Sequence, residues 1–432
     1  MRLRALLFTL ICLLSTVAPP ALGSTREPGP LVLRGATIID GSGGPVLPSR
    51  TLVLESGWIT DIYGDGEKPV PAGADVRELD GYYIIPGLID SHVHVGGATD
   101  ERLTWALLGG VTTIREMAGD GAYLRELQEA IEQGELDAPD IYFSAIMGGP
   151  ELIQKDPRVK LATPPAYALG TAPWARQIDE NSDLPAVVAE AKACGATGLK
   201  LYADLSAELV RGLTAEAHRQ GLRVWAHAVI SPATVEDVIN AGVNSVSHAL
   251  AFLLPPDWRF GKNNAQDVDP QLLNPGRMAR LAAAMKAHNT FLDPTLTVYY
   301  DRAGVSSSSG EAAEQQEAFS AEVVGQLHRA DVRIVAGTDR PPPRVEGELP
   351  AIHDEMQLLV EKAGLEPLQA IVAATKNGAL LLGIDRTHGT IERGNVADLV
   401  VLRKDPLEDI KNTTTIAFVV KRGRIIPGKV DR

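Results

Sequence analysis

The most constraining feature of this 432-residue chain is a middle region in which strand-like and helix-like segments alternate eight times. The eight predicted strands cover residues 82–95, 111–117, 140–146, 197–204, 223–228, 245–250, 290–296 and 333–339. Alternation of this kind requires parallel strands joined by right-handed crossovers, and eight such units predict an α/β protein built on a closed (β/α)₈ TIM barrel. An open doubly wound sheet is the alternative, but no GxGxxG motif follows the first strand, which disfavours its dinucleotide-binding form.

Helix-period segments fill the gaps between these strands, and several begin at Ser, Asp or Pro and end at Gly. The predicted helices are residues 122–133, 184–195, 206–221, 231–242, 275–288 and 317–330. Two connections are long, 147–181 and 251–274. Long loops at the mouth of a barrel more often shape a substrate site than fill space.

The two ends of the chain differ from the middle, because both consist of short strands broken by Gly and Pro. Residues 24–84 and residues 386–432 are therefore expected to form one small β-sandwich domain, with the barrel over residues 85–385.

The first 23 residues predict a cleaved signal peptide, and hence a secreted or periplasmic protein. Arg2 and Arg4 precede an apolar run, 5–17, and Ala21-Leu22-Gly23 is a small-residue cleavage site. The apolar run is shorter than the ~20 residues that span a bilayer, so a stable membrane anchor is not expected.

Charge and cysteine content narrow the function further. The chain carries a formal net charge of −14, with no clustered Lys and Arg, so nucleic acid is not an expected partner. Signal cleavage would leave Cys194 as the only cysteine, which excludes an intramolecular disulfide and a cysteine-built zinc site. A metal would have to be bound by His, carboxylate or modified Lys.

Five polar residues fall at the ends of predicted barrel strands, where barrel enzymes place their active sites. His92 and His94 are two residues apart and so share one strand face, while His227, His248 and Asp339 end later strands. Each alone is more often a structural residue. Their common placement favours a metal site, because imidazole and carboxylate are suitable ligands.

Lys200 lies within a predicted strand between Leu199 and Leu201. A buried lysine is costly unless it is neutral or paired. As a free amine it could react with CO₂ to form a carbamate, an anionic bidentate ligand. The alternative is an ordinary lysine that reaches water or pairs with Asp204.

The motifs PGLIDSHVHV, LKLY, WAHA, VSHA and GTD together resemble the amidohydrolase superfamily, in particular its imidazolonepropionase-like and Xaa-Pro dipeptidase-like branch. The segments IIDGSGGP and GTIERGNVADLVVLRKDPLEDI resemble the opening and closing parts of that family. The resemblance covers essentially the whole chain after the signal peptide, and it implies a barrel with a split β-sandwich.

The resemblance also implies two divalent metal ions, of which zinc is the expected type, and a metal-bridging hydroxide that attacks an amide or peptide-like C–N bond. The implied metal ligands are His92, His94, a carbamate on Lys200, His227, His248 and Asp339. Asp339 is also the implied proton shuttle. The expected substrate is a small amide or dipeptide, as for a dipeptidase or N-acyl amino acid hydrolase, and a homo-oligomer stays open.

Other activities compete with this interpretation. A related deaminase would carry an acid three residues beyond His227, where this chain has Ile230. A mononuclear, imidazolonepropionase-like hydrolase of cyclic amides would lack the bridging lysine, and a non-catalytic periplasmic binding protein would not use the acid. Substrate contacts are hypothesised for Tyr202, Arg340 and Arg115 from their location.

Overall fold

The computed structural model describes residues 29–428, apart from residues 65, 261, 264–266 and 301–310, so the predicted signal peptide lies outside the described residues. The barrel strands are β6 (Leu88–Val93), β7 (Val111–Glu116), β8 (Asp140–Gly148), β11 (Gly198–Leu201), β12 (Arg223–His227), β13 (Ser245–Ser247) and β14 (Phe291–Asp293). All neighbouring pairs in this series are parallel. The predicted barrel is therefore confirmed.

The eighth predicted strand, 333–339, closes the barrel without forming a regular ladder. The Val335 amide donates to the Leu292 carbonyl at 2.9 Å, and the Ser91 amide donates to the Ala336 carbonyl at 2.8 Å. The segment therefore joins β14 to β6. Its irregularity follows from the turn at its end, which carries the candidate site residues.

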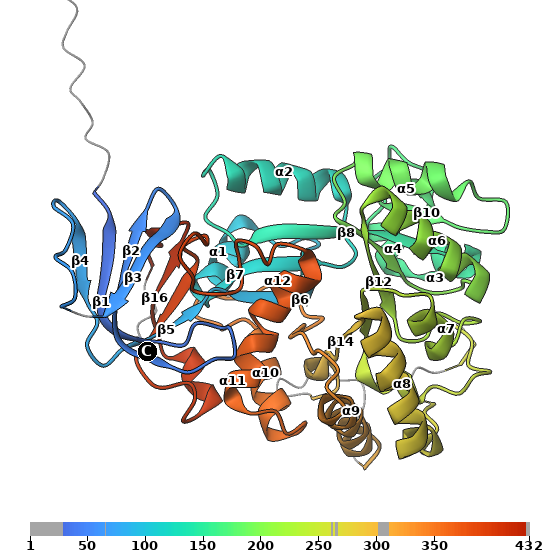
Figure 1. The fold of residues 1–432 in the computed structure, drawn as a ribbon. Helices are drawn as coiled ribbons and strands as arrows, with labels where there is room; N and C mark the ends of the chain where they lie inside the picture. The colour runs from blue at the N-terminus through green and yellow to red at the C-terminus, as the bar shows by residue number, and fades with distance from the viewer. Residues whose placement is uncertain (1–28, 65, 261, 264–266, 301–310, 429–432) are drawn as a thin grey trace, which may run out of the picture.

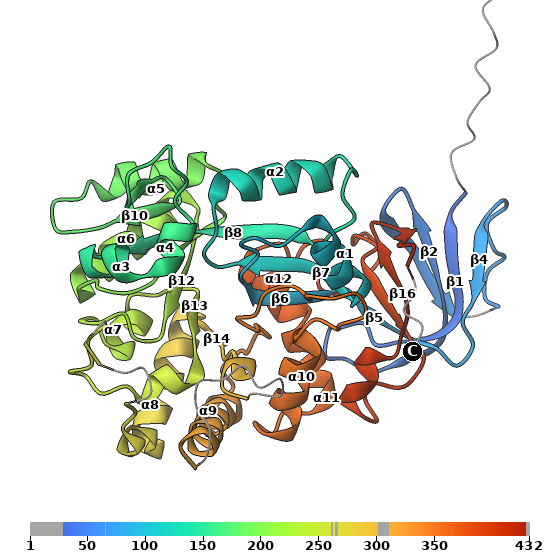
Figure 2. The same ribbon diagram turned by 180° about the vertical axis from the view of Figure 1, so that it is seen from behind.

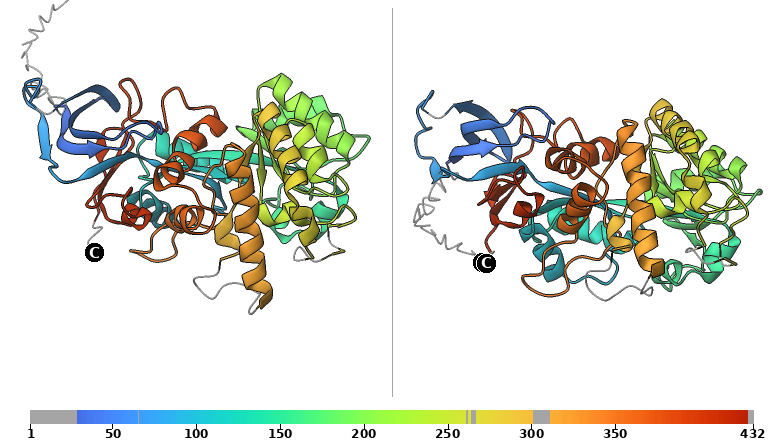
Figure 3. Two further views of the ribbon diagram at one scale, coloured as in Figure 1. Left: turned by 60° about the horizontal axis from the view of Figure 1, so that its bottom comes forward. Right: turned by 90° about the horizontal axis from the view of Figure 1, so that it is seen from below.

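Helices alternate with the strands around the barrel (Figures 1 and 3). They are α1 (Asp100–Leu108), α2 (Gly121–Glu132), α5 (Leu184–Ala193), α6 (Ala207–Gln220), α7 (Val235–Asn240), α8 (Pro275–His288), α9 (Glu311–Arg329), α10 (Ile352–Glu361), α11 (Pro367–Ala373) and α12 (Lys376–Leu382), with short 3₁₀ turns at Ala249–Leu253, Pro270–Leu273, Leu296–Val298 and Ile410–Thr414. The six predicted helices are all present. The predicted start residue Ser206 caps α6, and Asn274, one residue before the predicted start of α8, caps that helix.

The long connection 147–181 is not a bare loop. It contains two short helices, α3 (Pro150–Lys155) and α4 (Pro157–Leu161), and a hairpin of β9 (Thr171–Ala172) and β10 (Ala175–Gln177). β10 pairs in parallel with the last residues of β8. The connection thus extends the sheet at the carboxyl end of β8, beside α3 and α4 (Figure 2).

Both chain ends meet in a second sheet at one end of the molecule, where the blue and red strands lie side by side in Figure 1. Its strands are β1 (Leu31–Ile38), β2 (Leu47–Glu55), β3 (Trp58–Gly64), β4 (Asp75–Glu78), β5 (Tyr83–Pro86), β15 (Leu399–Leu402), β16 (Ile416–Lys421) and β17 (Arg424–Ile425). The two ends join where β15 pairs antiparallel with β5. Leu33, Leu52 and Val401 lie in its apolar core.

A buried ion-pair cluster connects this sheet to the barrel. The Lys421 ammonium group lies 2.7 Å from carboxylate oxygens of both Asp140 and Asp398, and it donates to the Thr112 carbonyl at 2.9 Å. The positive charge of Lys421 offsets the cost of burying the negative charges of these two carboxylates.

In the described part of the chain, no helix is both long and apolar enough to cross a membrane.

Candidate active site

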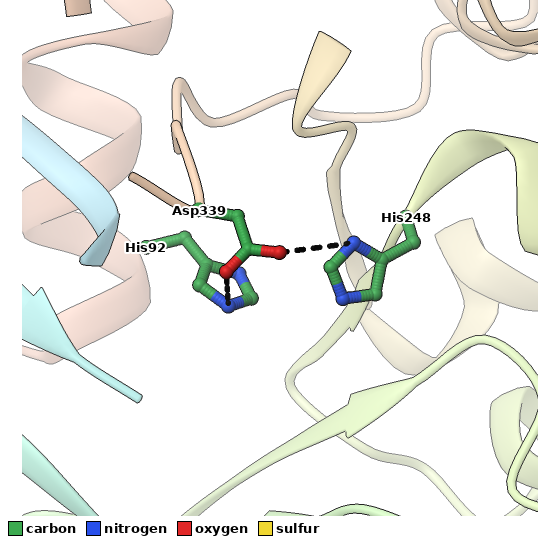
Figure 4. Close-up of side chains that lie close together, drawn as sticks. All are labelled: His92, His248 and Asp339. Carbon is green, nitrogen blue, oxygen red and sulfur yellow. Dashed lines mark ion pairs between the residues drawn. The ribbon is translucent and has the colours of Figure 1, made fainter. Parts of the chain in front are cut away.

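The structure brings three of the predicted histidines together around Asp339. The Asp339 Oδ1 lies 2.8 Å from His94 Nε2 and 3.5 Å from His92 Nε2, while its Oδ2 lies 3.9 Å from His248 Nδ1. Figure 4 shows the carboxylate between the rings of His92 and His248. These side chains come from β6, from the turn after β13 and from the closing segment, so the barrel itself assembles the cluster.

The remaining predicted residues continue the cluster on the side of β11 and β12. The His227 and His248 ring centroids are 4.7 Å apart, and the Tyr202 and His227 centroids are 4.3 Å apart. The Lys200 Nζ lies 4.8 Å from the centre of the Tyr202 ring. Lys200, His227 and Tyr202 thus form a second half of the site beside the group around Asp339.

Two of these residues are held in an unusual backbone conformation. His248 has φ = 74° and Asp339 has φ = 53°, a region that only a few per cent of residues other than Gly adopt, with Asn, Asp and His the more frequent among them. Such strain costs on the order of 1–3 kcal/mol and persists where the surroundings enforce it, typically at functional sites. His248 is held by its Nδ1, which lies 2.9 Å from the Thr295 hydroxyl.

The His92 ring is prepared to bind a cation. Its Nδ1 lies 2.7 Å from the Asp293 carboxylate and must donate to it, which leaves the lone pair on Nε2. That Nε2 is buried and has no hydrogen-bond partner within the described residues. Burial also lowers the pKa of His92 to about 3, so the ring is neutral. A buried nitrogen without a partner, beside a carboxylate, fits a metal ligand.

Lys200 also fits the predicted chemistry. It is 1% exposed, and burial lowers its pKa to about 8. Among the described residues, its ammonium group forms no salt bridge or hydrogen bond, and Asp204 does not pair with it. The free amine, which is the species that reacts with CO₂, is therefore much more populated near neutral pH than it is for an ordinary lysine.

Asp339 is ionised in this setting. Burial opposes its negative charge, but the imidazoles of His92 and His94 outweigh burial and hold the pKa of Asp339 well below its ordinary value. The carboxylate can therefore accept a proton from a neighbouring group or bind a cation.

The structure does not bring Arg115 to the site, so its hypothesised contact with substrate is corrected. Arg115 is fully buried, and its guanidinium group crosses the barrel interior to the Ser91 carbonyl, the Ser245 hydroxyl and the Asp293 carboxylate. Because these hydrogen bonds occupy its donors inside the barrel, Arg115 holds the Asp293 carboxylate in place and does not contact a substrate.

Arg340 lines a cavity that the predicted metal ligands do not line. Its Nη2 donates to the Thr297 carbonyl, and the side chain lines this cavity of about 180 Å³ together with Tyr300 and Glu348. Tyr202, by contrast, lies against His227.

Sequence reasoning missed three buried carboxylates near the site. Asp293 ends β14, and Glu116 ends β7 with its Oε1 4.0 Å from His94 Nδ1, so both meet the strand-end criterion that found the histidines. Glu355 lies on α10 and accepts from the Leu296 and Thr297 amides at 3.0 and 2.8 Å. No strand-end pattern points to Glu355.

Replacing Asp293 by Ala should destabilise the fold strongly and weaken metal binding. The change leaves the buried Arg115 charge without its partner, which costs about 3–5 kcal/mol, and frees His92 Nδ1, which lowers metal affinity about 10- to 100-fold. Urea unfolding and metal titration measure the two effects. Asp137→Ala, which removes the exposed ion pair to Arg424, is the matched control and should cost under about 1 kcal/mol. Equal effects of the two variants would contradict the supporting role of Asp293.

Glu355 should make stability fall as pH rises. Burial raises its pKa from 4.5 to about 8, and the two amide hydrogen bonds oppose this only in part. The unfolded chain loses this proton near pH 4.5 and the folded chain near pH 8, so the stabilisation is complete below pH 4.5 and is lost up to pH 8. The unfolding free energy of wild type relative to Glu355→Gln should therefore decrease by on the order of a few kcal/mol across this range. A difference that is constant with pH would contradict it.

The chain is similar in sequence to proteins of known families. A sequence profile described as the amidohydrolase family matches residues 83–426. The chain is 25% identical to the ochratoxinase of Aspergillus niger, covering 95% of this chain and 89% of that protein. It is 26% identical to the imidazolonepropionase of Symbiobacterium thermophilum, covering 93% and 98%.

Solved structures show the same fold. The crystal structure of A. niger ochratoxinase superposes with a TM-score of 0.72 at 22% identity, covering 93% of this chain and 96% of that one. A Xaa-Pro dipeptidase crystallised with methionine in its active site gives a TM-score of 0.70 at 21% identity, covering 93% and 100%.

Proposed function

The chain belongs to the amidohydrolase family, and from this premise we propose that it is a metal-dependent hydrolase of small amides, with dipeptides and N-acyl amino acids as the substrate class. The observation that supports the proposal most is the convergence of the Asp339 carboxylate with the imidazoles of His92, His94 and His248 at the mouth of the barrel. Membership of the family supports an enzyme that acts on C–N bonds.

The proposed metal site uses both halves of the cluster. His92, His94 and Asp339 would hold one divalent cation, His227 and His248 a second, and a carbamate on Lys200 would lie between them. The cations, with zinc the expected type, would supply a nucleophilic water of lowered pKa and polarise the substrate carbonyl. The chemistry of the residues fits: burial lowers the pKa values of His92, His227 and His248, so these imidazoles are neutral, Asp339 is anionic, and Lys200 is partly a free amine.

In this proposal Asp339 moves the proton. Its carboxylate accepts the proton from the attacking water and then gives it to the nitrogen that leaves, so the amine departs neutral. The Asp339 Oδ1 lies 2.8 Å from His94 Nε2 and 3.5 Å from His92 Nε2, so the carboxylate lies beside the nitrogens that would hold the first cation. Asp293 fixes the tautomer of His92, and Thr295 holds His248.

A hydrolysis screen tests the proposed function. The zinc-loaded protein is assayed on dipeptides, N-acyl amino acids, lactams and lactones, with His92→Asn as the control that removes a proposed ligand. The proposal is supported if the protein turns over linear amides or dipeptides and if this activity is lost both when a metal chelator is added and in His92→Asn. Tight binding without turnover would favour a non-catalytic binding protein instead.

One observation favours a second candidate, a mononuclear hydrolase of cyclic amides. The ligand atoms of His92, His248 and Asp339 all lie within 4.8 Å of one another, whereas His94 and His227 do not belong to this group. Three ligands and a water suffice for one catalytic zinc. Lactam turnover with a single bound metal would support this candidate.

We further propose that the protein is exported, since residues 1–23 have the charge and apolar pattern of a signal peptide. Sequencing of the mature amino terminus should find cleavage near Gly23.

A further inference from the structure

Arg158 is a cation at the edge of the site that none of the preceding steps uses. It lies in α4, within the long connection after β8. The Arg158 Cζ is 5.1 Å from the centre of the Tyr202 ring, the ring that also contacts Lys200 and packs against His227. Tyr202 is therefore shared between this arginine and the proposed ligands.

The Arg158 side chain is fixed in one orientation. Asp156 accepts from Nε at 2.9 Å and from Nη2 at 2.6 Å, and it also accepts from the Arg158 backbone amide at 2.8 Å. The Asp156 side chain is 2% exposed, so this anchor is part of the interior. A bidentate pair of this kind restricts both partners to one geometry.

The opposite side of the guanidinium group is open. Within the described residues, Nη1 of Arg158 forms no hydrogen bond, and 53% of the side chain is exposed. Arg115 and Arg340 differ from Arg158 in this respect. Arg115 is fully buried in the barrel interior, and Arg340 lines a different cavity. Arg158 thus combines a fixed orientation with an accessible donor edge.

The positive charge of Arg158 also affects the pKa values of residues at the centre of the site. After the larger effect of burial, Arg158 contributes to lowering the pKa values of Lys200, His227 and His248. In turn, Asp339 contributes to raising the pKa of Arg158, against the effect of burial. The guanidinium group and the proposed ligands therefore share one electrostatic environment.

We propose that Arg158, oriented by Asp156 and Tyr202, is the specificity-determining residue that receives a carboxylate on the substrate next to the amide to be cleaved. The planar guanidinium group matches a carboxylate better than it matches a neutral amide. The inference rests on the proposed function. It assigns the residue that recognises the carboxylate shared by dipeptides and N-acyl amino acids, and it predicts discrimination against their uncharged carboxamides.

The experiment compares matched substrates that differ only in this charge. N-acetyl derivatives of the common L-amino acids and their carboxamides are assayed with the zinc-loaded full chain, as wild type and as Arg158→Met. Lys160→Met is the control, because it removes an exposed positive charge from the same helix α4. Arg158→Lys keeps the positive charge but removes the planar guanidinium group.

Wild type should prefer the free acids. Arg158→Met should lower kcat/KM for the acids by about 10- to 100-fold and for the carboxamides by less than ~2-fold, in line with the loss of a charge-assisted hydrogen bond. Lys160→Met should leave the preference unchanged, and Arg158→Lys should be intermediate. The melting temperature of each variant reports on its fold.

Four results would overturn the inference. A wild type that cleaves amides without preferring acids, or an acid preference that survives in both Arg158 variants, would refute it while the proposed function stands. An equal fall on acids and carboxamides would show that Arg158 is only structural. If wild type cleaves no member of either series and no dipeptide in the hydrolysis screen, the proposed function fails and the inference fails with it.

Discussion

Asp339→Asn should lower kcat by on the order of 10²- to 10⁴-fold while KM changes little, which is the range expected for loss of a positioned general acid–base group. Asparagine has nearly the same shape and can still contact His94, but it cannot accept the proton of the attacking water. An interaction made only in the transition state affects kcat and kcat/KM equally.

The measurement is steady-state kinetics on the best linear amide from the screen, with metal content determined on the same samples. Asp339 is also a proposed ligand, so the comparison is made at saturating zinc. Glu348→Gln, a change at the neighbouring cavity of Arg340, is a control that should retain activity. An Asp339→Asn enzyme that binds zinc normally and keeps more than about a tenth of the wild-type kcat would contradict the proton-transfer role.

Recovery of activity after metal removal should require bicarbonate as well as zinc. The buried amine of Lys200 has a pKa of about 8 and makes no ion pair among the described residues, so it is available to CO₂. Without the carbamate, a neutral amine replaces an anionic ligand between two cations, and their binding weakens. We expect at least ~10-fold more activity when zinc is added with bicarbonate than in CO₂-free buffer, equivalent to about 1.4 kcal/mol.

Lys200→Met provides the matched control, because it preserves the length of the side chain without the amine. This variant should recover little activity and show no response to bicarbonate. A ¹³C label supplied as bicarbonate should appear as a carbamate in wild type only. Full recovery of wild type in CO₂-free buffer would contradict the carbamate.

The fold could be predicted largely from sequence because its periodic patterns are strong. Parallel strands buried on both faces read as apolar runs, and the helices between them carry caps at both ends, as in α6 with Ser206 and Gly221. The closing segment 333–339 was harder to define. Gly337 and the positive φ of Asp339 interrupt it, so only isolated pairs form.

The position of a residue at a strand end indicated that it lies near the site. It did not indicate whether the side chain faces the mouth or the interior of the barrel. It drew attention to His92, His248 and Asp339, which the fold brings together. It also selected Arg115, whose long side chain turns into the barrel toward Asp293 and away from the mouth. Sequence position alone does not distinguish these two directions.

Residues outside the strands carried no pattern that could be used. Helix α4 has five residues, too few to show a helical period, so Arg158 and its anchor Asp156 gave no signal. Glu355 lies on a regular helix, α10, and its burial depends on packing against Leu296–Val298, far away in sequence. Such tertiary contacts appear only once the fold is known.

The most direct test of the account is the number of metal ions that one chain holds. Elemental analysis of zinc-loaded, extensively dialysed protein should give two ions per chain for wild type and about one for His227→Asn, because His227 belongs to the proposed second position. Two ions in both proteins would remove His227 from the ligand set. One ion or none in wild type would contradict the claim that these six side chains share a pair of cations.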